Sequence, residues 1–188
     1  MCKYKLYLIL LPALCVIFIS CNKSAYKALN TYDEYAKIID CIFSTIDGRT
    51  TKTYELKIAK YSQDGGIKEQ ISGLIHYKMM NRVDSLLDKL LKSNEDFDLD
   101  KIKLGEITRS MMAASNKNAE LICAINLYKI SIDDNMENAV CPYTRYLQDR
   151  KINNNGISGE DFVCLLERKQ NEWVITRQIG LGEYKLGR

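Results

Sequence analysis

The sequence has little of what most metal sites and catalytic motifs need. Its 188 residues include one histidine, His76, and two prolines. One histidine supplies no histidine-rich zinc site, and no H-E-x-x-H, G-x-x-x-x-G-K-[ST] or G-x-S-x-G pattern is present. Basic and acidic residues number 27 and 24, so the formal charge of +3 favours no nucleic-acid partner. We therefore predict a protein that is not an enzyme and that holds no cofactor and no metal.

Long apolar runs are also scarce, since only residues 6–19 form a long apolar run without a charge. A helix of this length spans about 21 Å, which is shorter than the roughly 30 Å of a bilayer core. Lys3 and Lys5 precede the run, and Ser20-Cys21 closes it. A basic segment, a short apolar segment and a small residue at its exit predict a secretory signal over residues 1–20. The alternative is an uncleaved signal anchor that extends back to Tyr4.

The residues at this exit resemble a known processing signal. Phe18-Ile19-Ser20-Cys21 resembles the lipobox of bacterial prolipoproteins, with small Ser20 before the cysteine and Phe18 where that family usually has Leu. The resemblance implies cleavage before Cys21, a diacylglyceryl thioether on its sulfur and an acyl chain such as palmitate on the new amino terminus. Two or three acyl chains give stable membrane anchoring. We expect a lipoprotein of the cell envelope whose domain lies outside the cytoplasm, and Asn22 after the cysteine is compatible with the outer membrane or the cell surface.

The rest of the chain is predicted to form one domain. Cleavage removes Lys3 and Lys5 and no acid, which lowers the formal charge from +3 to +1. Residues 21–30 form a lipidated tether that reaches about 30 Å when extended. Residues 31–188 contain no Pro-rich, Gly-rich or Ser-rich linker, so they are expected to fold as one globular domain.

Four cysteines remain after the lipidated one: Cys41, Cys123, Cys141 and Cys164. An even number in an exported protein favours a disulfide framework, for which three pairings exist. Buried free thiols are the alternative. A zinc site is disfavoured because no two of the four lie two to four residues apart.

Hydrophobic periodicity predicts an α+β fold, with a helix-rich N-terminal two-thirds packed on a small antiparallel sheet. A capping box formed by Thr31 and Glu34 begins the first helix. The segment 118–133 fits helix or strand, with a slight preference for helix. The predicted helices cover residues 31–46, 67–93 and 98–114; the predicted strands cover residues 54–58, 162–167 and 173–179, the last two forming a C-terminal hairpin with a turn at 168–172.

For function, the sequence favours a binding module for another envelope protein or a small ligand. The segment 142–146 is expected to be an exposed recognition segment with Tyr143, Arg145 and Tyr146, because Tyr and Arg are enriched at binding hot spots. Helices followed by strands, the last of which opens at Trp173-Val174-Ile175, are similar to NTF2-like lipoprotein domains. That resemblance implies a pocket between a curved sheet and helices.

Two other functions remain open at this stage. The chain could be a periplasmic inhibitor or immunity lipoprotein that blocks a hydrolase or toxin, with the loop 148–159 as the plug. An enzyme that uses scattered carboxylates would require an acid pair with raised pKa values in one cleft.

Overall fold

The computed structural model describes residues 31–59, 72, 85–88, 98–151 and 156–184. The predicted signal, Cys21, the tether, His76, most of the predicted helix 67–93 and residues 152–155 of the plug loop lie outside the described residues. No helix within the described ranges is long and apolar enough to cross a membrane.

The N-terminal helix covers residues 31–43 and carries the apolar stripe that the sequence predicts. Ile38, Ile39, Ile42 and Phe43 are fully buried, so this stripe faces the core as expected. Thr31 is already helical, so the capping box predicted there is wrong. The short helix α2 (Gly48–Thr53) follows after a turn and is capped by the Asp47 carboxylate, which accepts a hydrogen bond from the Arg49 amide.

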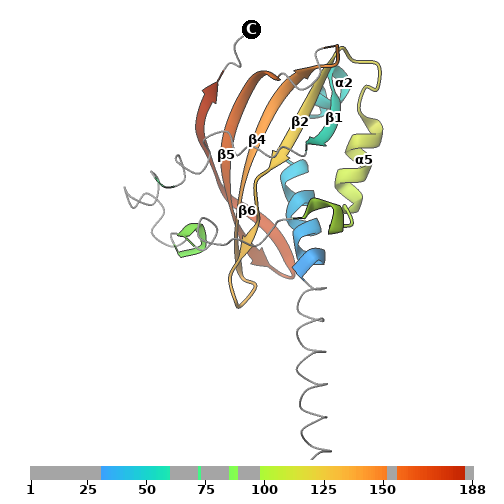
Figure 1. Cartoon of the computed structure of the whole chain (residues 1–188). Helices are drawn as coiled ribbons and strands as arrows, with labels where there is room; N and C mark the ends of the chain where they lie inside the picture. The colour runs from blue at the N-terminus through green and yellow to red at the C-terminus, as the bar shows by residue number, and fades with distance from the viewer. Residues whose placement is uncertain (1–30, 60–71, 73–84, 89–97, 152–155, 185–188) are drawn as a thin grey trace, which may run out of the picture.

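A six-stranded mixed sheet forms most of the described domain (Figure 1). Its spatial order is β1-β2-β4-β5-β6, with the short strand β3 also paired to β4. β1 runs parallel to β2, whereas all other neighbours are antiparallel. The strands are β1 (Glu55–Ala59), β2 (Leu121–Leu127), β3 (Ser131–Ile132), β4 (Asn138–Asp149), β5 (Gly156–Lys169) and β6 (Glu172–Tyr184).

The expected helix-rich architecture with a small antiparallel sheet is therefore wrong. The sheet is large and mixed: β4 lies where no strand is predicted, and β5 begins well before the strand predicted at 162–167. β4 is buried on both faces, so its sequence lacks the alternation by which half-buried strands are recognised. Pro142 also argues against a central strand, but it lies opposite the break between β2 and β3, where a missing N–H group is tolerated.

The slight preference for helix over residues 118–133 is also wrong, because this segment forms β2 and β3. Cys123, Ile125 and Leu127 belong to the main core, whereas Ile122 and Ala124 pack in a separate cluster on the other face. A strand that is apolar on both faces has no period of two, and its spacing can match a helix by chance.

The helix predicted over residues 98–114 is broken in two. A 3-10 turn, η1 (Leu99–Lys101), and the helix α5 (Glu106–Ala114) flank an extended Gly105. The break has a tertiary cause, since Gly105 lies against the carboxylate of Asp40 from the N-terminal helix. That carboxylate accepts hydrogen bonds from the amides of Ile107 and Thr108 and caps α5.

The predicted C-terminal hairpin is confirmed, with a shorter turn than expected. β5 and β6 pair in antiparallel register as far as Lys169 and Glu172. The two turn residues, Gln170 and Asn171, both have positive φ angles of 51° and 70°. Positive φ at both central positions is typical of the type I′ turn that joins two-residue hairpins.

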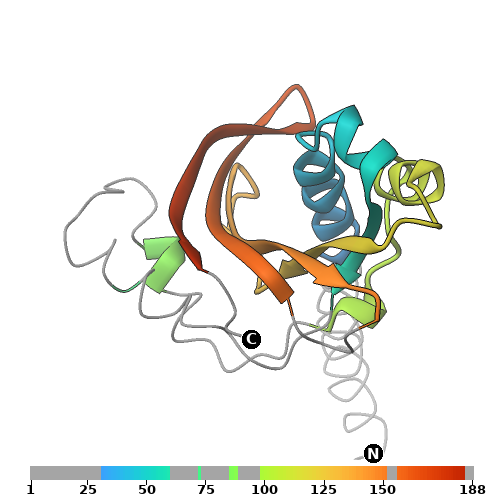
Figure 2. The ribbon, with the colours of Figure 1, turned by 90° about the horizontal axis from the view of Figure 1, so that it is seen from above.

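The sheet curls around the N-terminal helix, which lies on its concave side (Figure 2). Register shifts between Leu147 and Gln148 in β4 and at two places in β5 contribute to this curvature, because bulges bend a strand. The convex side is covered in part by the helical turn at residues 85–88, whose Leu86 and Leu87 pack in one cluster with residues of β4 and β5. The concave side therefore holds the main core. The N-terminal helix covers only part of this side.

Candidate functional site

The predicted recognition segment 142–146 lies in the central strand β4 and not on an exposed loop. Tyr143 and Tyr146 are only 3% and 6% exposed, so the expected exposure of these two side chains is wrong. Alternation along the strand separates them: Tyr143 packs in the main core on the concave side, and Tyr146 packs with Ile122 on the convex side. Arg145 shares the concave face with Tyr143.

Polar and aromatic side chains from three strands meet on this concave face, and we call them the concave polar patch. Arg145 donates to Oε2 of Glu160 through Nε at 3.1 Å and also through Nη2. Its guanidinium carbon lies 5.4 Å from the centre of the Phe162 ring, which stacks on Tyr143 at 5.1 Å. Gln178 Nε2 donates to the Tyr143 hydroxyl at 3.1 Å. The patch consists of Tyr143, Arg145, Glu160, Phe162 and Gln178.

The register explains why these residues meet. Arg145 is paired with Glu160, and Tyr143 with Phe162, across β4 and β5. Gly180 on β6 is paired with Phe162. Residues two apart on one strand share a face, so the two cross-strand pairs form adjacent rows. Glu160 and Gln178 were not predicted as site residues, because the spacing within one strand does not reveal which residue lies opposite on the next.

The patch is open to solvent at its polar rim. The side chains of Arg145 and Glu160 are 41% and 35% exposed, Phe162 is half-buried and Gln178 is exposed. Tyr143 forms the buried floor beneath them. The site thus combines a solvent-accessible ion pair with two stacked aromatic side chains, Tyr143 and Phe162.

The electrostatics of the patch favour binding over proton transfer. Partial burial alone would lower the pKa of the Arg145 guanidinium, but the hydrogen bond and charge of Glu160 outweigh it and raise that pKa. Burial raises the pKa of Tyr143 far above its usual range, and it raises the pKa of the nearby Cys123 thiol to about 11. All three groups therefore keep their ordinary protonation state near neutral pH, whereas general acid–base catalysis needs a pKa near the working pH.

The alternative of carboxylate chemistry receives no support from buried Glu34 or half-buried Asp133. Burial alone would raise the pKa values of Glu34 and Asp133, but hydrogen bonds outweigh it and lower both. An acid pair for catalysis would need the opposite shift. In the described part of the chain, no group of three or more His, Cys, Asp or Glu side chains is arranged to hold a metal ion.

The four cysteines are free thiols in the structure. Cys141 on β4 lies directly opposite Cys164 on β5, and both are fully buried. Cys41 donates its Sγ hydrogen to the backbone oxygen of Trp173 at 3.3 Å, which fits its position beside the helix stripe. Cys123 lies apart on β2, opposite Leu147. Of the three pairings, the one that joins Cys141 to Cys164 therefore links residues at neighbouring cross-strand positions, a separation compatible with a disulfide.

A buried carboxylate fixes the helix to the hairpin below the patch. Glu34 Oε2 accepts a hydrogen bond from Trp173 Nε1 at 2.6 Å, and Oε1 accepts from Lys37 at 2.7 Å and from Arg168 at 3.4 Å. Arg168 also lies 6.0 Å from the Trp173 ring. This cluster holds the N-terminal helix across the end of the concave face where β5 turns into β6.

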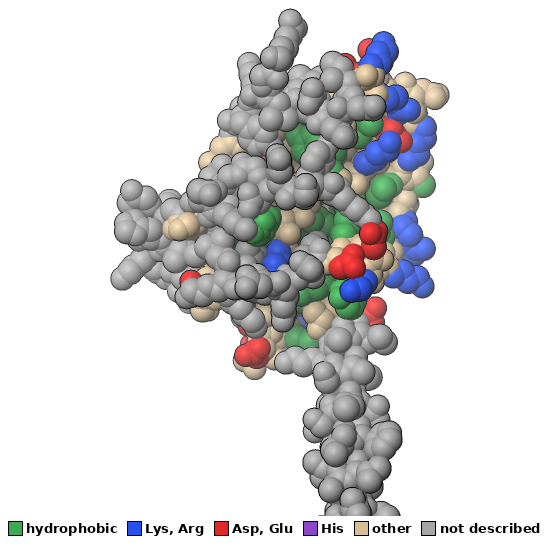
Figure 3. All heavy atoms as spheres, in the orientation of Figure 1, with side chains coloured by type: hydrophobic (Ala, Val, Ile, Leu, Met, Phe, Trp, Pro, Cys, Tyr) green, Lys and Arg blue, Asp and Glu red, His purple; other side chains and the backbone are tan. Residues whose placement is uncertain are grey.

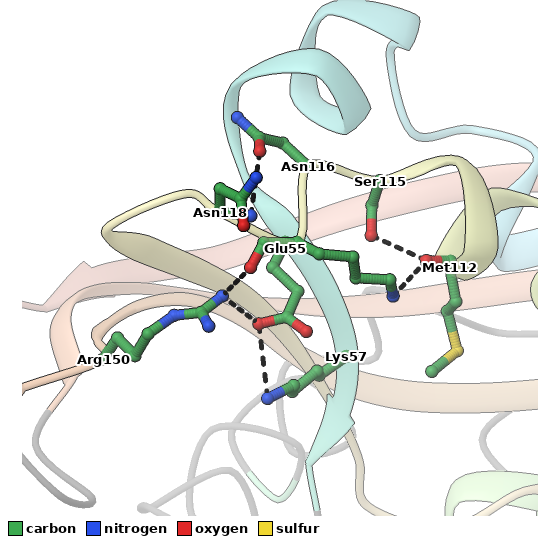
Figure 4. A network of polar contacts seen from close by, with 8 residues as sticks. Glu55, Lys57, Met112, Ser115, Asn116, Asn118 and Arg150 are labelled. Atoms are coloured by element: carbon green, nitrogen blue, oxygen red, sulfur yellow. Dashed lines mark hydrogen bonds and ion pairs between the residues drawn. The ribbon is translucent and has the colours of Figure 1, made fainter.

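A second polar network joins the far edge of the sheet (Figure 4). Arg150, just after β4, donates to Glu55 of β1 at 2.6 Å and to the backbone oxygen of Lys117 at 2.6 Å. Lys57 pairs with the same Glu55 carboxylate at 3.3 Å. Arg150 and Lys57 both pair with Oε2 of Glu55. Since this oxygen already has two cationic partners, we assign the cluster a structural role.

Lys and Arg side chains gather along the side of the molecule where α5 lies (Figure 3). Five exposed cations on and beside α2 and α5 form no ion pair within the described ranges: Arg49, Lys52, Lys103, Arg109 and Lys117. Exposed acids, such as Glu106 and Glu120, lie among them. This side is therefore only moderately basic. It lacks the concave surface and the stacked aromatic rings of the concave polar patch.

Comparison with known proteins assigns the chain to no family and no function. No family model and no curated protein matches the chain. Among solved structures, the intermembrane space region of the chloroplast protein ARC6 aligns with 65% of this chain and 99% of its own, at 15% sequence identity and a TM-score of 0.20. A likeness at this score supports no inference about fold or function.

Proposed function

We propose that the chain is a lipid-anchored binding protein of the cell envelope, and that its concave polar patch binds another envelope protein or a small ligand. The observation that carries the proposal is a partly exposed Arg145–Glu160 pair above the stacked Tyr143 and Phe162 rings. Binding sites characteristically combine an apolar lining with a few placed polar groups. The anchor at Cys21 rests on the lipobox resemblance, and the NTF2-like resemblance remains a prediction.

A binding role without catalysis agrees with the protonation states of the patch. Arg145 and Glu160 offer charged hydrogen-bonding groups, and the neighbouring phenol and thiol stay neutral. Such a set recognises a ligand by shape and hydrogen bonding.

Site-specific photo-crosslinking in cells tests the binding role. A photoreactive phenylalanine analogue at Gln178 reports on the concave polar patch, and the same analogue at the exposed Val174, four residues earlier on β6, is the matched control. We expect an adduct from position 178 that is absent from position 174 and is lost when Arg145→Ala is combined with the probe. Equal adducts from both positions, or an adduct indifferent to Arg145, would contradict the proposal.

Intact mass of the membrane fraction tests the anchor separately. The wild type should lack residues 1–20 and carry added acyl mass, and Cys21→Ser should lose both changes. An unprocessed and unacylated wild-type chain would refute the lipoprotein part of the proposal.

A further inference from the structure

The Arg145–Glu160 pair leaves a donor and an acceptor side by side on the rim of the patch. Both bonds from Arg145 go to Oε2 of Glu160. In the part of the chain that the structure describes, the second N–H of Arg145 Nη2 and Oε1 of Glu160 form no hydrogen bond, and both side chains are partly exposed. A guanidinium has more N–H groups than one carboxylate oxygen uses, so the pair can bind a further molecule without separating.

A backbone segment in extended conformation matches this arrangement. The N–H and C=O groups of one extended residue point to the same side, as they do where antiparallel strands exchange two hydrogen bonds. Its carbonyl oxygen can accept from the second N–H of Arg145 Nη2 while its N–H donates to Oε1 of Glu160. Hydrogen bonds of this charge-assisted kind are stronger than neutral ones.

The charge of the pair disfavours a simple anion or cation. A carboxylate ligand attracted by Arg145 would face repulsion from Glu160, and an ammonium ligand would face repulsion from Arg145. A peptide group carries no net charge and uses both neighbours.

An apolar side chain of the ligand has a surface beside the pair. Gly180 lies opposite Phe162 and has no side chain, whereas a Cβ at this position would touch Cε1 of Phe162 at 4.0 Å. At this position β6 therefore places no side chain over the Cε1 edge of the half-buried Phe162 ring. Aromatic pairs prefer edge-to-face or offset contacts, so an aromatic ligand residue fits here.

From these observations we infer that the concave polar patch binds an extended peptide segment, with one residue bonded through its backbone to Arg145 and Glu160 and its aromatic side chain against Phe162. The inference rests on the proposed function and narrows its ligand to a peptide, such as an extended segment of another envelope protein.

Peptide titration of the full chain, purified from membranes in detergent and labelled with ¹⁵N, tests the inference. The probe is N-acetyl-Ala-Phe-Ala-amide, and its matched control carries a methyl group on the phenylalanine nitrogen, which removes the N–H that would donate to Glu160. We expect shifts confined to β4, β5 and β6 around the patch, with affinity at least about tenfold weaker for the methylated peptide, since a hydrogen bond to a charged group contributes about 1.5–3 kcal/mol. Arg145→Ala should weaken the first peptide similarly, and Arg177→Ala on the same sheet should not.

The outcomes separate this inference from the proposed function. Equal affinity for the two peptides, or no binding of either while position 178 still forms its Arg145-dependent adduct, would overturn the peptide inference and leave a ligand at the patch. Absence of both peptide binding and the adduct would overturn the two together.

Discussion

At the scale of single residues, Glu34 shows how one carboxylate connects parts of the chain that are far apart in sequence. It lies in the first described turns of the N-terminal helix, and it binds Trp173 and Arg168 at the C-terminal hairpin. The carboxylate is buried, so its removal would leave the Trp173 N–H and the Arg168 guanidinium without their charged partner. Buried groups left unpaired are destabilising.

We expect Glu34→Gln to lower the free energy of unfolding at pH 7 by about 2 kcal/mol, since the amide keeps an acceptor for Trp173 but loses the charge. The pKa of Glu34 in the folded state lies below its ordinary value of 4.5. The stabilisation is therefore fully present above that value and is lost as pH falls through the folded-state pKa. Urea denaturation at a series of pH values should show a smaller loss of stability below pH 4.5 in the variant than in the wild type.

Asp133, whose pKa is also lowered, keeps some acid dependence in both proteins. The matched control is Glu137→Gln at an exposed position, for which we expect a change within about 0.5 kcal/mol. Identical pH curves for wild type and Glu34→Gln would contradict the assigned role.

At the scale of elements, α5 begins where it does because another helix caps it. Gly105 has no side-chain cap of its own. The Asp40 carboxylate accepts hydrogen bonds from the amide of Ile107 at 3.2 Å, and from the amide and the hydroxyl of Thr108 at 2.9 and 2.6 Å. The close approach of this carboxylate requires glycine at position 105.

Gly105→Ala should destabilise the protein by about 1–3 kcal/mol, because the new Cβ would clash with the carboxylate of Asp40. Gly48→Ala at the start of α2, where a Cβ meets no atom within 4 Å, is the control and should not destabilise. The double variant Asp40→Ala/Gly105→Ala should lose less than the sum of its single variants, since the clash is gone. Additive losses in thermal or urea unfolding would argue against this capping contact.

At the scale of the whole molecule, the curled sheet and its helix close a core that excludes the thiols from solvent. Cys123, Cys141 and Cys164 are nearly inaccessible, and burial raises the pKa of Cys164 to about 12. The thiolate is the reactive form, so burial and the raised pKa both slow reaction with alkylating agents.

Alkylation of the folded chain should accordingly modify half-buried Cys41 first and these three thiols much more slowly. With a pKa of about 11, only about one Cys123 thiol in a thousand is ionised at pH 8, so its native labelling should accelerate about tenfold per pH unit. Peptide mass mapping gives the rates. Labelling of Cys123 as fast in the folded state as in urea would contradict the closed core.

The same experiment in urea without reductant tests whether a disulfide forms; the sequence leaves three pairings open, and the structure places Cys141 opposite Cys164. If Cys141 and Cys164 are joined in the exported chain, these two cysteines should remain unlabelled until reductant is added. Labelling of all four would favour buried free thiols.

Elements whose pattern is local were predictable. The stripe of the N-terminal helix, the strand around Leu56 and the C-terminal hairpin each follow from periodicity within a short segment. Two segments were not predictable, namely the doubly buried strands β2 and β4, because burial on both faces removes the alternation that marks a strand.

The sequence by itself determined these local elements, and the resemblance of residues 18–21 to a lipobox supports the proposed anchor at Cys21. Only the tertiary structure decided that residues 142–146 lie in a central strand, that Glu160 and Gln178 complete the patch, and that the sheet dominates the fold. The physical reason is register: cross-strand neighbours are set by how whole strands align in a bulged and curved sheet, and no short-range spacing along the chain encodes that alignment.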